Sequence, residues 1–123
     1  MSAPLKILAV DDEPSIAQSM RFIFTHPLYE LSSALDGATA LARIADDPQS
    51  FDVVITDSHM PGVSGVDLVR MLRERHFTGK IVVLSAHLST DVRAAYEAME
   101  VDALIEKPFS VKALRAKLDQ LAA

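Results

Sequence analysis

Short apolar runs alternate with amphipathic segments along the whole chain, and this order strongly constrains the fold. Runs that predict buried strands lie at residues 5–10, 28–33, 51–55, 80–84 and 103–105. After each run, apolar residues recur at helical spacing, as Ile16, Met20 and Ile23 do in the first such segment. Strands that alternate with helices pair in parallel and are covered by helices on both faces. The sequence therefore predicts an α/β, doubly wound layer sandwich with five strands and five helices.

Turn and capping residues agree with this division. Pro14 suits a first helical turn, and Ser110 suits the N-cap of the last helix. Asp36-Gly37 and Thr78-Gly79 suit turns. The expected apolar faces of the four later helices are Leu41 and Ala45; Val66, Val69 and Leu72; Val92, Ala95, Tyr96 and Met99; and Val111, Leu114, Leu118 and Leu121.

The length and composition are those of one globular domain. A chain of 123 residues can bury roughly two-thirds of the surface that it exposes when unfolded. Hydrophobic residues make up 50% of the chain and charged residues 24%, which is unlike disordered or fibrous sequences. We expect residues 1–123 to form a single domain that folds alone.

Several functional classes are disfavoured by composition. A formal net charge of -5 offers no basic surface to a phosphate backbone, so no direct binding of nucleic acid is expected. The chain has no cysteine, which excludes disulfides and thiolate metal sites. Its apolar runs are far shorter than the ~20 residues of a membrane span, and its first six residues lack the layout of a signal peptide. We expect no membrane insertion and a cytoplasmic location.

Polar residues gather where the predicted strands end. Asp11 and Asp12 follow the first strand, and Asp57 follows the third. Ser85 follows the fourth strand and Lys107 the fifth. Because the carboxyl ends of parallel strands share one edge of the sheet, where ligands bind, we expect these side chains to lie close together. Carboxylates that close either raise one another's pKa or recruit a cation, and a hard divalent cation is the expected solution.

This set of side chains suits phosphoryl chemistry. Magnesium prefers oxygen ligands, so one or two carboxylates, a carbonyl and a phosphoryl oxygen can complete its coordination with water. With its charge screened, a carboxylate can attack a phosphoryl group and form an acyl phosphate. Lys107 and Ser85 can then receive the negative charge of the phosphoryl oxygens. We expect Asp57 to be the nucleophile, and Asp11 and Asp12 to be ligands of the cation.

Four motifs extend this interpretation to a known family. They are residues 7–14 (ILAVDDEP), residues 57–62 (DSHMPG) with Gly65, residues 84–86 (LSA) and residues 107–109 (KPF). Through them the chain resembles, along its whole length, the receiver domains of two-component response regulators, including the single-domain chemotaxis regulator. The resemblance implies a flavodoxin-like three-layer sandwich whose five parallel strands lie in the order 2-1-3-4-5.

The resemblance also implies a function in a phosphorelay. A histidine kinase or histidine phosphotransfer protein would transfer a phosphoryl group to Asp57, and the aspartyl phosphate would later be lost by hydrolysis. The chain would therefore be no enzyme beyond catalysing its own phosphorylation and dephosphorylation. Mg²⁺ or Mn²⁺ would be held by Asp12, Asp57 and the main-chain carbonyl of His59, with Asp11 reaching it through water. A cis peptide is implied between Lys107 and Pro108.

In the family, phosphorylation draws the hydroxyl at the Ser85 position inward, and an aromatic residue three positions before the lysine turns in behind it. That switch position here is Leu104, which puts the aromatic response in doubt. Output passes to a downstream protein or an attached output domain through the fourth helix, fifth strand and fifth helix. In this chain that surface is expected to include Arg93, Tyr96, Glu97, Lys112 and Arg115.

The four histidines do not have the spacing of a zinc site, such as two histidines four residues apart. His59 and His87 each lie two residues after a predicted site residue, Asp57 and Ser85 respectively. We expect these two histidines to flank the entrance to the phosphoryl group and to tune the lifetime of the acyl phosphate by admitting or blocking water.

Three other functions agree with parts of this pattern. A haloacid-dehalogenase-like phosphohydrolase needs a second aspartate two residues after the nucleophile, where this chain has His59. A flavodoxin-like FMN binder needs a hydroxyl- and glycine-rich loop after the first strand, where the acidic residues 11–13 would repel the phosphate. A receiver-like interaction module that takes no phosphate would not need the five polar side chains, although Leu104 leaves an altered output open. The sequence also leaves open whether the chain is a stand-alone regulator or a piece of a longer protein.

Overall fold

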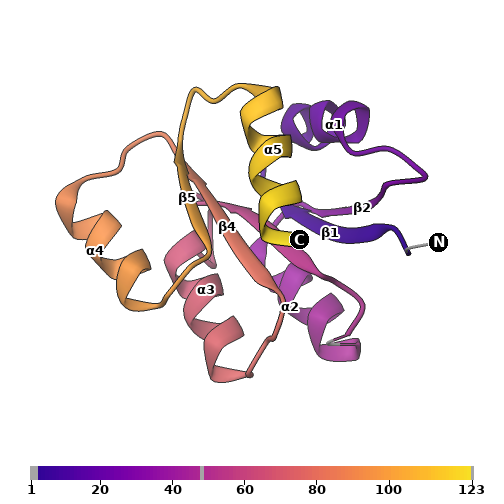
Figure 1. Cartoon of the computed structure of the whole chain (residues 1–123). Helices are drawn as coiled ribbons and strands as arrows, with labels where there is room; N and C mark the ends of the chain where they lie inside the picture. Colours follow the sequence, from indigo (N-terminus) through magenta and orange to yellow (C-terminus); the bar gives the residue numbers. More distant parts are fainter. Residues whose placement is uncertain (1–2, 48, 123) are drawn as a thin grey trace.

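The computed structural model describes residues 3–47 and 49–122, and in this part of the chain five strands form one parallel sheet (Figure 1). The strand order is β2-β1-β3-β4-β5, as the resemblance implied. The strands are β1 (Leu5–Val10), β2 (Tyr29–Ala34), β3 (Val53–Asp57), β4 (Lys80–Ser85) and β5 (Ala103–Glu106). The predicted parallel sheet is confirmed, with strand ends that differ from the sequence prediction by one or two residues.

Helices cover both faces of the sheet, which confirms the predicted layer sandwich. They are α1 (Pro14–Ile23), α2 (Gly37–Asp46), α3 (Gly65–Glu74), α4 (Thr90–Ala98) and α5 (Val111–Ala122). The helices α1 and α5 lie on one face of the sheet and α2, α3 and α4 on the other (Figure 1). Each layer packs on the sheet through its own hydrophobic core. No helix of the described residues is long and apolar enough to cross a membrane.

The two cores explain why the strands are continuous apolar runs. In β1, Ile7 and Ala9 pack beneath α1 and α5, whereas Leu8 and Val10 pack against the other helical layer. Successive side chains of a strand point to opposite faces, so a sheet covered on both faces needs apolar residues at every position.

Capping residues set several helix starts. Pro14 occupies the first turn of α1 as predicted, and Ser110 Oγ accepts a hydrogen bond from Ala113 N at 2.9 Å, which confirms Ser110 as a cap. Asp36-Gly37 was predicted as a turn, but Asp36 is the N-cap of α2, where its side chain accepts a hydrogen bond from Thr39 N at 2.7 Å.

Two residues assigned to apolar faces by their spacing are exposed instead. Ala45 is exposed because Ile44, one turn after Leu41, takes the core-facing position near the end of α2. Val111 is 49% exposed because it is the first residue of α5, and burial in that helix begins with Leu114 one turn later. Helical spacing therefore located the faces but not the ends of their buried parts.

Candidate functional site

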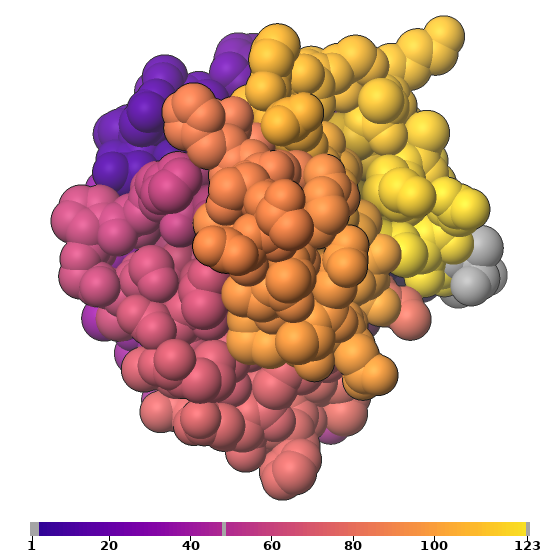
Figure 2. All heavy atoms as spheres, turned by 90° about the vertical axis from the view of Figure 1, so that its left-hand side faces the viewer, coloured from indigo at the N-terminus to yellow at the C-terminus, as the bar shows by residue number. Residues whose placement is uncertain are grey.

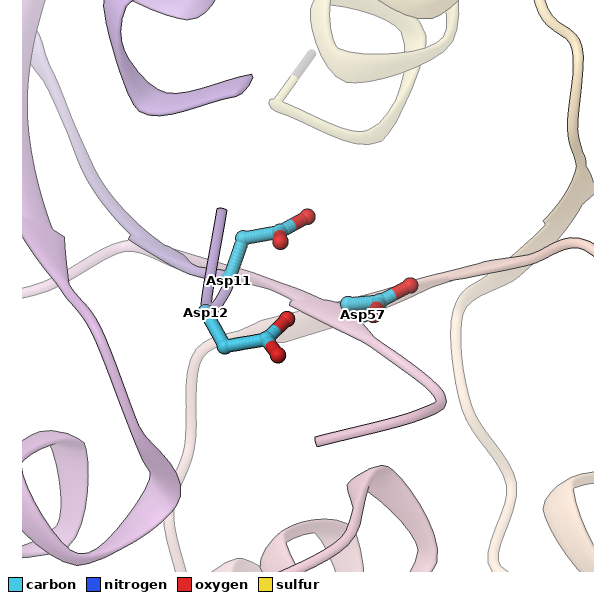
Figure 3. Close-up of side chains that lie close together, drawn as sticks. All are labelled: Asp11, Asp12 and Asp57. Atoms are coloured by element: carbon cyan, nitrogen blue, oxygen red, sulfur yellow. The ribbon is translucent and has the colours of Figure 1, made fainter. Parts of the chain in front are cut away.

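Three carboxylates lie side by side at the carboxyl edge of the sheet (Figure 3). Asp11 and Asp12 directly follow β1, and Asp57 is the last residue of β3. One oxygen of each carboxylate lies within 4.8 Å of the others. Asp11 and Asp57 are only 5% and 8% exposed, whereas Asp12 is exposed. We call these three residues the acidic cluster. The structure thus brings together the three aspartates that the strand ends predicted.

Asp11 is the member of the acidic cluster whose negative charge is least well stabilised. Its Oδ1 accepts a hydrogen bond from Glu13 N at 3.0 Å, while its buried Oδ2 makes no hydrogen bond with the described residues. Burial raises the pKa of Asp11 from 3.8 to about 6; the charges of Asp57 and Asp12 add to this, and Lys107 opposes it. A buried carboxylate oxygen without a partner is costly unless a proton or a cation satisfies it.

Lys107 brings the positive charge of the site. It lies in the loop after β5, and its Nζ donates a hydrogen bond of 2.9 Å to Asp57 Oδ1 and lies 3.9 Å from Asp11 Oδ2. Burial alone lowers the pKa of Lys107, but the hydrogen bond and charge of Asp57 outweigh it, and the net pKa is raised. The ammonium therefore stays charged at neutral pH. The peptide between Lys107 and Pro108 is cis, as the resemblance implied.

Ser85 ends β4 and is fully buried. Its Oγ donates a hydrogen bond to His87 O at 3.2 Å and accepts one from His87 N at 3.3 Å. The main chain around it is tied to neighbouring strand ends, because Ser85 O accepts a hydrogen bond from Lys107 N at 2.8 Å. The hydroxyl is therefore held at the carboxyl edge of the sheet, where the acidic cluster lies, but its hydrogen bonds are with the main chain of His87.

The two histidines near the site are exposed. His59 lines a shallow surface hollow beside the end of β3, together with Ser58, Met60 and Pro61. His87 lies in the loop between β4 and α4, where its main chain binds Ser85. Their side chains are thus placed in loops that follow the ends of β3 and β4, and their predicted effect on phosphoryl lifetime stays a prediction.

Tyr96 corrects the predicted output surface. It was expected both on the apolar face of the fourth helix and in the output surface, but it is 0% exposed and its Oη lies 2.8 Å from Ser58 Oγ. Burial, and to a lesser extent the charge of Asp57, raise the pKa of Tyr96 against the opposing effect of the Ser58 hydrogen bond, so its hydroxyl stays protonated. The helical spacing of Val92, Tyr96 and Met99 indicated this position, since all three pack against the same core.

The other residues of the predicted output surface lie outside the core. Arg93 and Glu97 on α4 are exposed, as are Lys112 and Arg115 on α5. Leu104, at the predicted switch position in β5, is half-buried and packs against the core that contains Tyr96. Ser58, the partner of Tyr96, lies inside a motif that the sequence shows, but the motif alone predicts no separate role for it.

Comparison with known proteins identifies the family. A model of the response regulator receiver domain matches residues 7–119. The chain belongs to this family. This receiver domain is 34% identical over 118 residues to the response regulator MprA of Mycolicibacterium vanbaalenii, covering 96% of this chain and 50% of that protein. It is 36% identical over 114 residues to the transcriptional regulatory protein KdpE of Mycobacterium tuberculosis, covering 91% of this chain and 48% of that protein. The receiver domain thus spans about half the length of these relatives.

Solved structures agree with this assignment. The chemotaxis protein CheY4 of Vibrio cholerae has a TM-score of 0.86 at 30% identity, covering 97% of this chain and 99% of the other. A response regulator receiver domain protein from Clostridium thermocellum has a TM-score of 0.87 at 26% identity, covering 95% of this chain and 93% of the other. The chain therefore has the flavodoxin-like receiver fold, with the acidic cluster at the carboxyl edge of its sheet.

Proposed function

We propose that this receiver domain is the phosphoacceptor switch of a two-component phosphorelay. Asp57 receives a phosphoryl group from a phosphohistidine of a histidine kinase or of a histidine phosphotransfer protein. The observation that carries this proposal is the 2.9 Å contact of Lys107 Nζ with Asp57 Oδ1 within the acidic cluster. This contact joins a carboxylate nucleophile to a fixed positive charge at an edge where phosphoryl oxygens would gather.

The proposed transfer needs few chemical parts. A carboxylate oxygen of Asp57 attacks phosphorus, and the phosphorus–nitrogen bond of the donor breaks. The imidazole leaves with the bonding electrons and takes up a proton. Lys107 and, after reorientation, the hydroxyl of Ser85 stabilise charge on the phosphoryl oxygens. Later attack by water on phosphorus releases phosphate and restores the Asp57 carboxylate, so the domain catalyses only its own modification and recovery.

The acidic cluster fits a hard divalent cation, Mg²⁺ or Mn²⁺. All its donors are carboxylate oxygens, and the buried Asp11 Oδ2 lacks a hydrogen-bond partner among the described residues. Asp11, Asp12, Asp57 and the main-chain carbonyl of His59 would hold the ion, with Asp11 acting through water. When bound, the ion supplies positive charge that screens the carboxylates from one another and from the incoming phosphoryl group.

The proposed output is a conformational change around Ser85, α4 and β5. The side chains of Arg93, Glu97, Lys112 and Arg115 provide an exposed charged surface on α4 and α5 for a downstream protein or an attached output domain. The relatives MprA and KdpE are named a response regulator and a transcriptional regulatory protein, and this domain covers about half of each. A regulatory output is proposed for this chain by analogy with them.

The direct test is incubation with a small phosphodonor and Mg²⁺, followed by intact mass measurement. Wild type should gain one phosphoryl group, and Asp57→Asn should gain none. Asp46→Asn is the matched control, because Asp46 is an exposed aspartate at the end of α2 and should leave the adduct unchanged. An adduct that persists in Asp57→Asn, or its absence from wild type, would refute the proposal.

A further inference from the structure

The helix α4 covers one side of the molecule between α3 and α5 (Figure 2). Of its nine residues, all described by the structure, Tyr96 alone is fully buried. The neighbouring α3 is attached differently, since Leu68, Val69 and Leu72 are all buried in the same core. Val92 on α4 packs against this core only in part, so Tyr96 is the most deeply buried contact of the helix.

The hydroxyl of Tyr96 contacts the residue that follows the proposed phosphoacceptor. Its Oη is 2.8 Å from Ser58 Oγ, and Ser58 directly follows Asp57. A Cβ added at Gly65 would lie 2.7 Å from Tyr96 Oη and 2.6 Å from Asp57 O, so a glycine is needed for this approach. The one fully buried side chain of α4 thus ends beside Ser58, the residue next to Asp57.

Ser58 is tied to both proposed phosphoryl-binding strand ends. It is covalently joined to Asp57, and its N–H donates a 2.9 Å hydrogen bond to Leu84 O, the residue before Ser85. A rearrangement of either Asp57 or Ser85 therefore acts on Ser58. If Ser58 moved alone, the Tyr96 hydroxyl would remain buried without its partner, which is unfavourable.

A second attachment of α4 has no such link. Arg73 of α3 donates hydrogen bonds to the carbonyls of Met99 (2.9 Å) and Glu100 (2.7 Å), just beyond the end of α4. This contact holds the C-terminal end of α4 against α3. Because the C-terminal end of α4 is held, a displacement of Tyr96 would tilt the N-terminal part of the helix.

We propose that the Ser58–Tyr96 hydrogen bond couples the phosphorylation state of Asp57 to the position of α4. This inference rests on the proposed function, because it assigns a route to the output of that same site. Tyr96 is a positioning residue in this scheme and does not touch the phosphoryl group. Two arrangements of the Ser58–Tyr96 pair, biased by the state of Asp57, are the two-state element that coupling requires.

The chain offers a specific optical probe of this pair. It contains two tyrosines and no tryptophan, so Tyr29→Phe leaves Tyr96 as the sole source of tyrosine fluorescence. Tyr29 is a matched control, because it is also buried and its hydroxyl hydrogen-bonds to Asp119 on α5, on the opposite face of the sheet. We expect phosphorylation with a small phosphodonor and Mg²⁺ to change the emission of Tyr29→Phe and not that of Tyr96→Phe.

The decisive comparison uses hydrogen exchange of α4 before and after phosphorylation. Wild type and Tyr29→Phe should show a change in α4 exchange. Tyr96→Phe and Ser58→Ala each remove one hydroxyl of the pair, and each should still be phosphorylated on Asp57 while losing most of that change. The double variant should lose no more than either single variant, because both act on one interaction.

The outcomes separate the two proposals. Intact mass reports phosphorylation, so an unmodified wild type refutes the proposed function, and the coupling falls with it. Phosphorylated Tyr96→Phe and Ser58→Ala whose α4 responds as in wild type would overturn the coupling alone. Loss of phosphorylation in both variants, with cooperative unfolding retained, would also overturn it, because the pair would then shape the acceptor site and not transmit its state.

Discussion

The ammonium of Lys107 donates a 2.9 Å hydrogen bond to Oδ1 of Asp57, a residue 50 positions away in the chain. The side chains are 26% and 10% exposed, so solvent screens their interaction only in part. Because Lys107 also lies 3.9 Å from Asp11 Oδ2, a single positive charge offsets part of the repulsion within the acidic cluster. In the proposed function, the same ammonium would stabilise the oxygens of a phosphoryl group on Asp57.

Replacing Lys107 should slow phosphorylation strongly. Lys107→Met keeps an unbranched apolar chain but removes the charge, so phosphoryl oxygens lose a fixed positive partner. We expect the phosphorylation rate to fall by about 100-fold, the usual effect of deleting one such donor. The measurement is a time course of intact mass with a small phosphodonor and Mg²⁺. Lys112→Met, on the exposed surface of α5, should behave as wild type, and a wild-type rate for Lys107→Met would refute this role.

Asp11 should destabilise the metal-free fold at neutral pH. Its pKa is raised to about 6 in the folded state, so folding disfavours its charged form. Protonation therefore stabilises the fold as the pH falls below about 6, and this stabilisation is lost as the pH rises through about 6. Asp11→Asn removes the charge and should raise the free energy of unfolding at pH 7.5 by about 1–2 kcal/mol, with little difference near pH 4.

Urea unfolding in EDTA at several pH values would measure this effect. Asp12→Asn is the matched control, because Asp12 is the exposed member of the acidic cluster and its replacement should change the unfolding free energy little. An Asp11→Asn variant that is less stable than wild type at pH 7.5 would contradict this prediction, because the charged Asp11 carboxylate would then stabilise the fold.

Divalent cations should reverse the order of stability of wild type and Asp11→Asn. An ion that binds only the folded state stabilises it by about 2.7 kcal/mol at a concentration 100 times its dissociation constant. We expect Mg²⁺ to raise the unfolding midpoint of wild type, and to raise those of Asp11→Asn and Asp57→Asn much less. Thermal unfolding with increasing MgCl₂, compared with equal ionic strength from NaCl, checks this. Equal shifts in all three proteins would exclude the acidic cluster as the binding site.

The sequence predicted the acidic cluster from polar residues placed at the ends of buried parallel strands. Asp11, Asp57 and Lys107 each follow a buried apolar run, and parallel strands bring such positions to one edge. Helical spacing likewise placed Tyr96 on a core-facing side, yet it did not identify Ser58 as its partner. That contact depends on how α4 lies over the sheet, which periodicity does not determine. That Asp11 Oδ2 lacks a hydrogen-bond partner among the described residues was also beyond prediction, because it depends on atomic positions.

Gly65→Ala should disrupt the loop after β3. Alanine is favoured over glycine within a helix by up to ~1 kcal/mol, but position 65 begins α3, and its Cβ would lie 2.6 Å from Asp57 O and 2.8 Å from Ser58 Cα. Overpacking against backbone should dominate and cost about 2 kcal/mol of unfolding free energy, with slower phosphorylation.

Gly62→Ala provides a comparison for the same measurements. Gly62 has φ 77, and nothing lies within 4 Å of its would-be Cβ, so only backbone strain of roughly 1 kcal/mol is expected. Denaturant unfolding of both variants distinguishes the two effects. If Gly65→Ala is as stable as wild type, the predicted overpacking is wrong, and the backbone at Asp57 and Ser58 can move to accept a Cβ at position 65.

His59 and His87 should set how fast the aspartyl phosphate hydrolyses. Both side chains are exposed in loops that follow the strands ending in Asp57 and Ser85, and we expect them to flank the proposed phosphoryl position. Replacing both with alanine should admit water and shorten the half-life about two- to fivefold, a barrier change below ~1 kcal/mol. The decay of the phosphorylated mass after donor removal gives the half-life. His76→Asn is the control, because His76 lies in the α3–β4 connection at the opposite edge of the sheet and asparagine tolerates its φ of 58. An unchanged half-life in the double variant would mean that water reaches the phosphoryl group by a route that neither imidazole restricts.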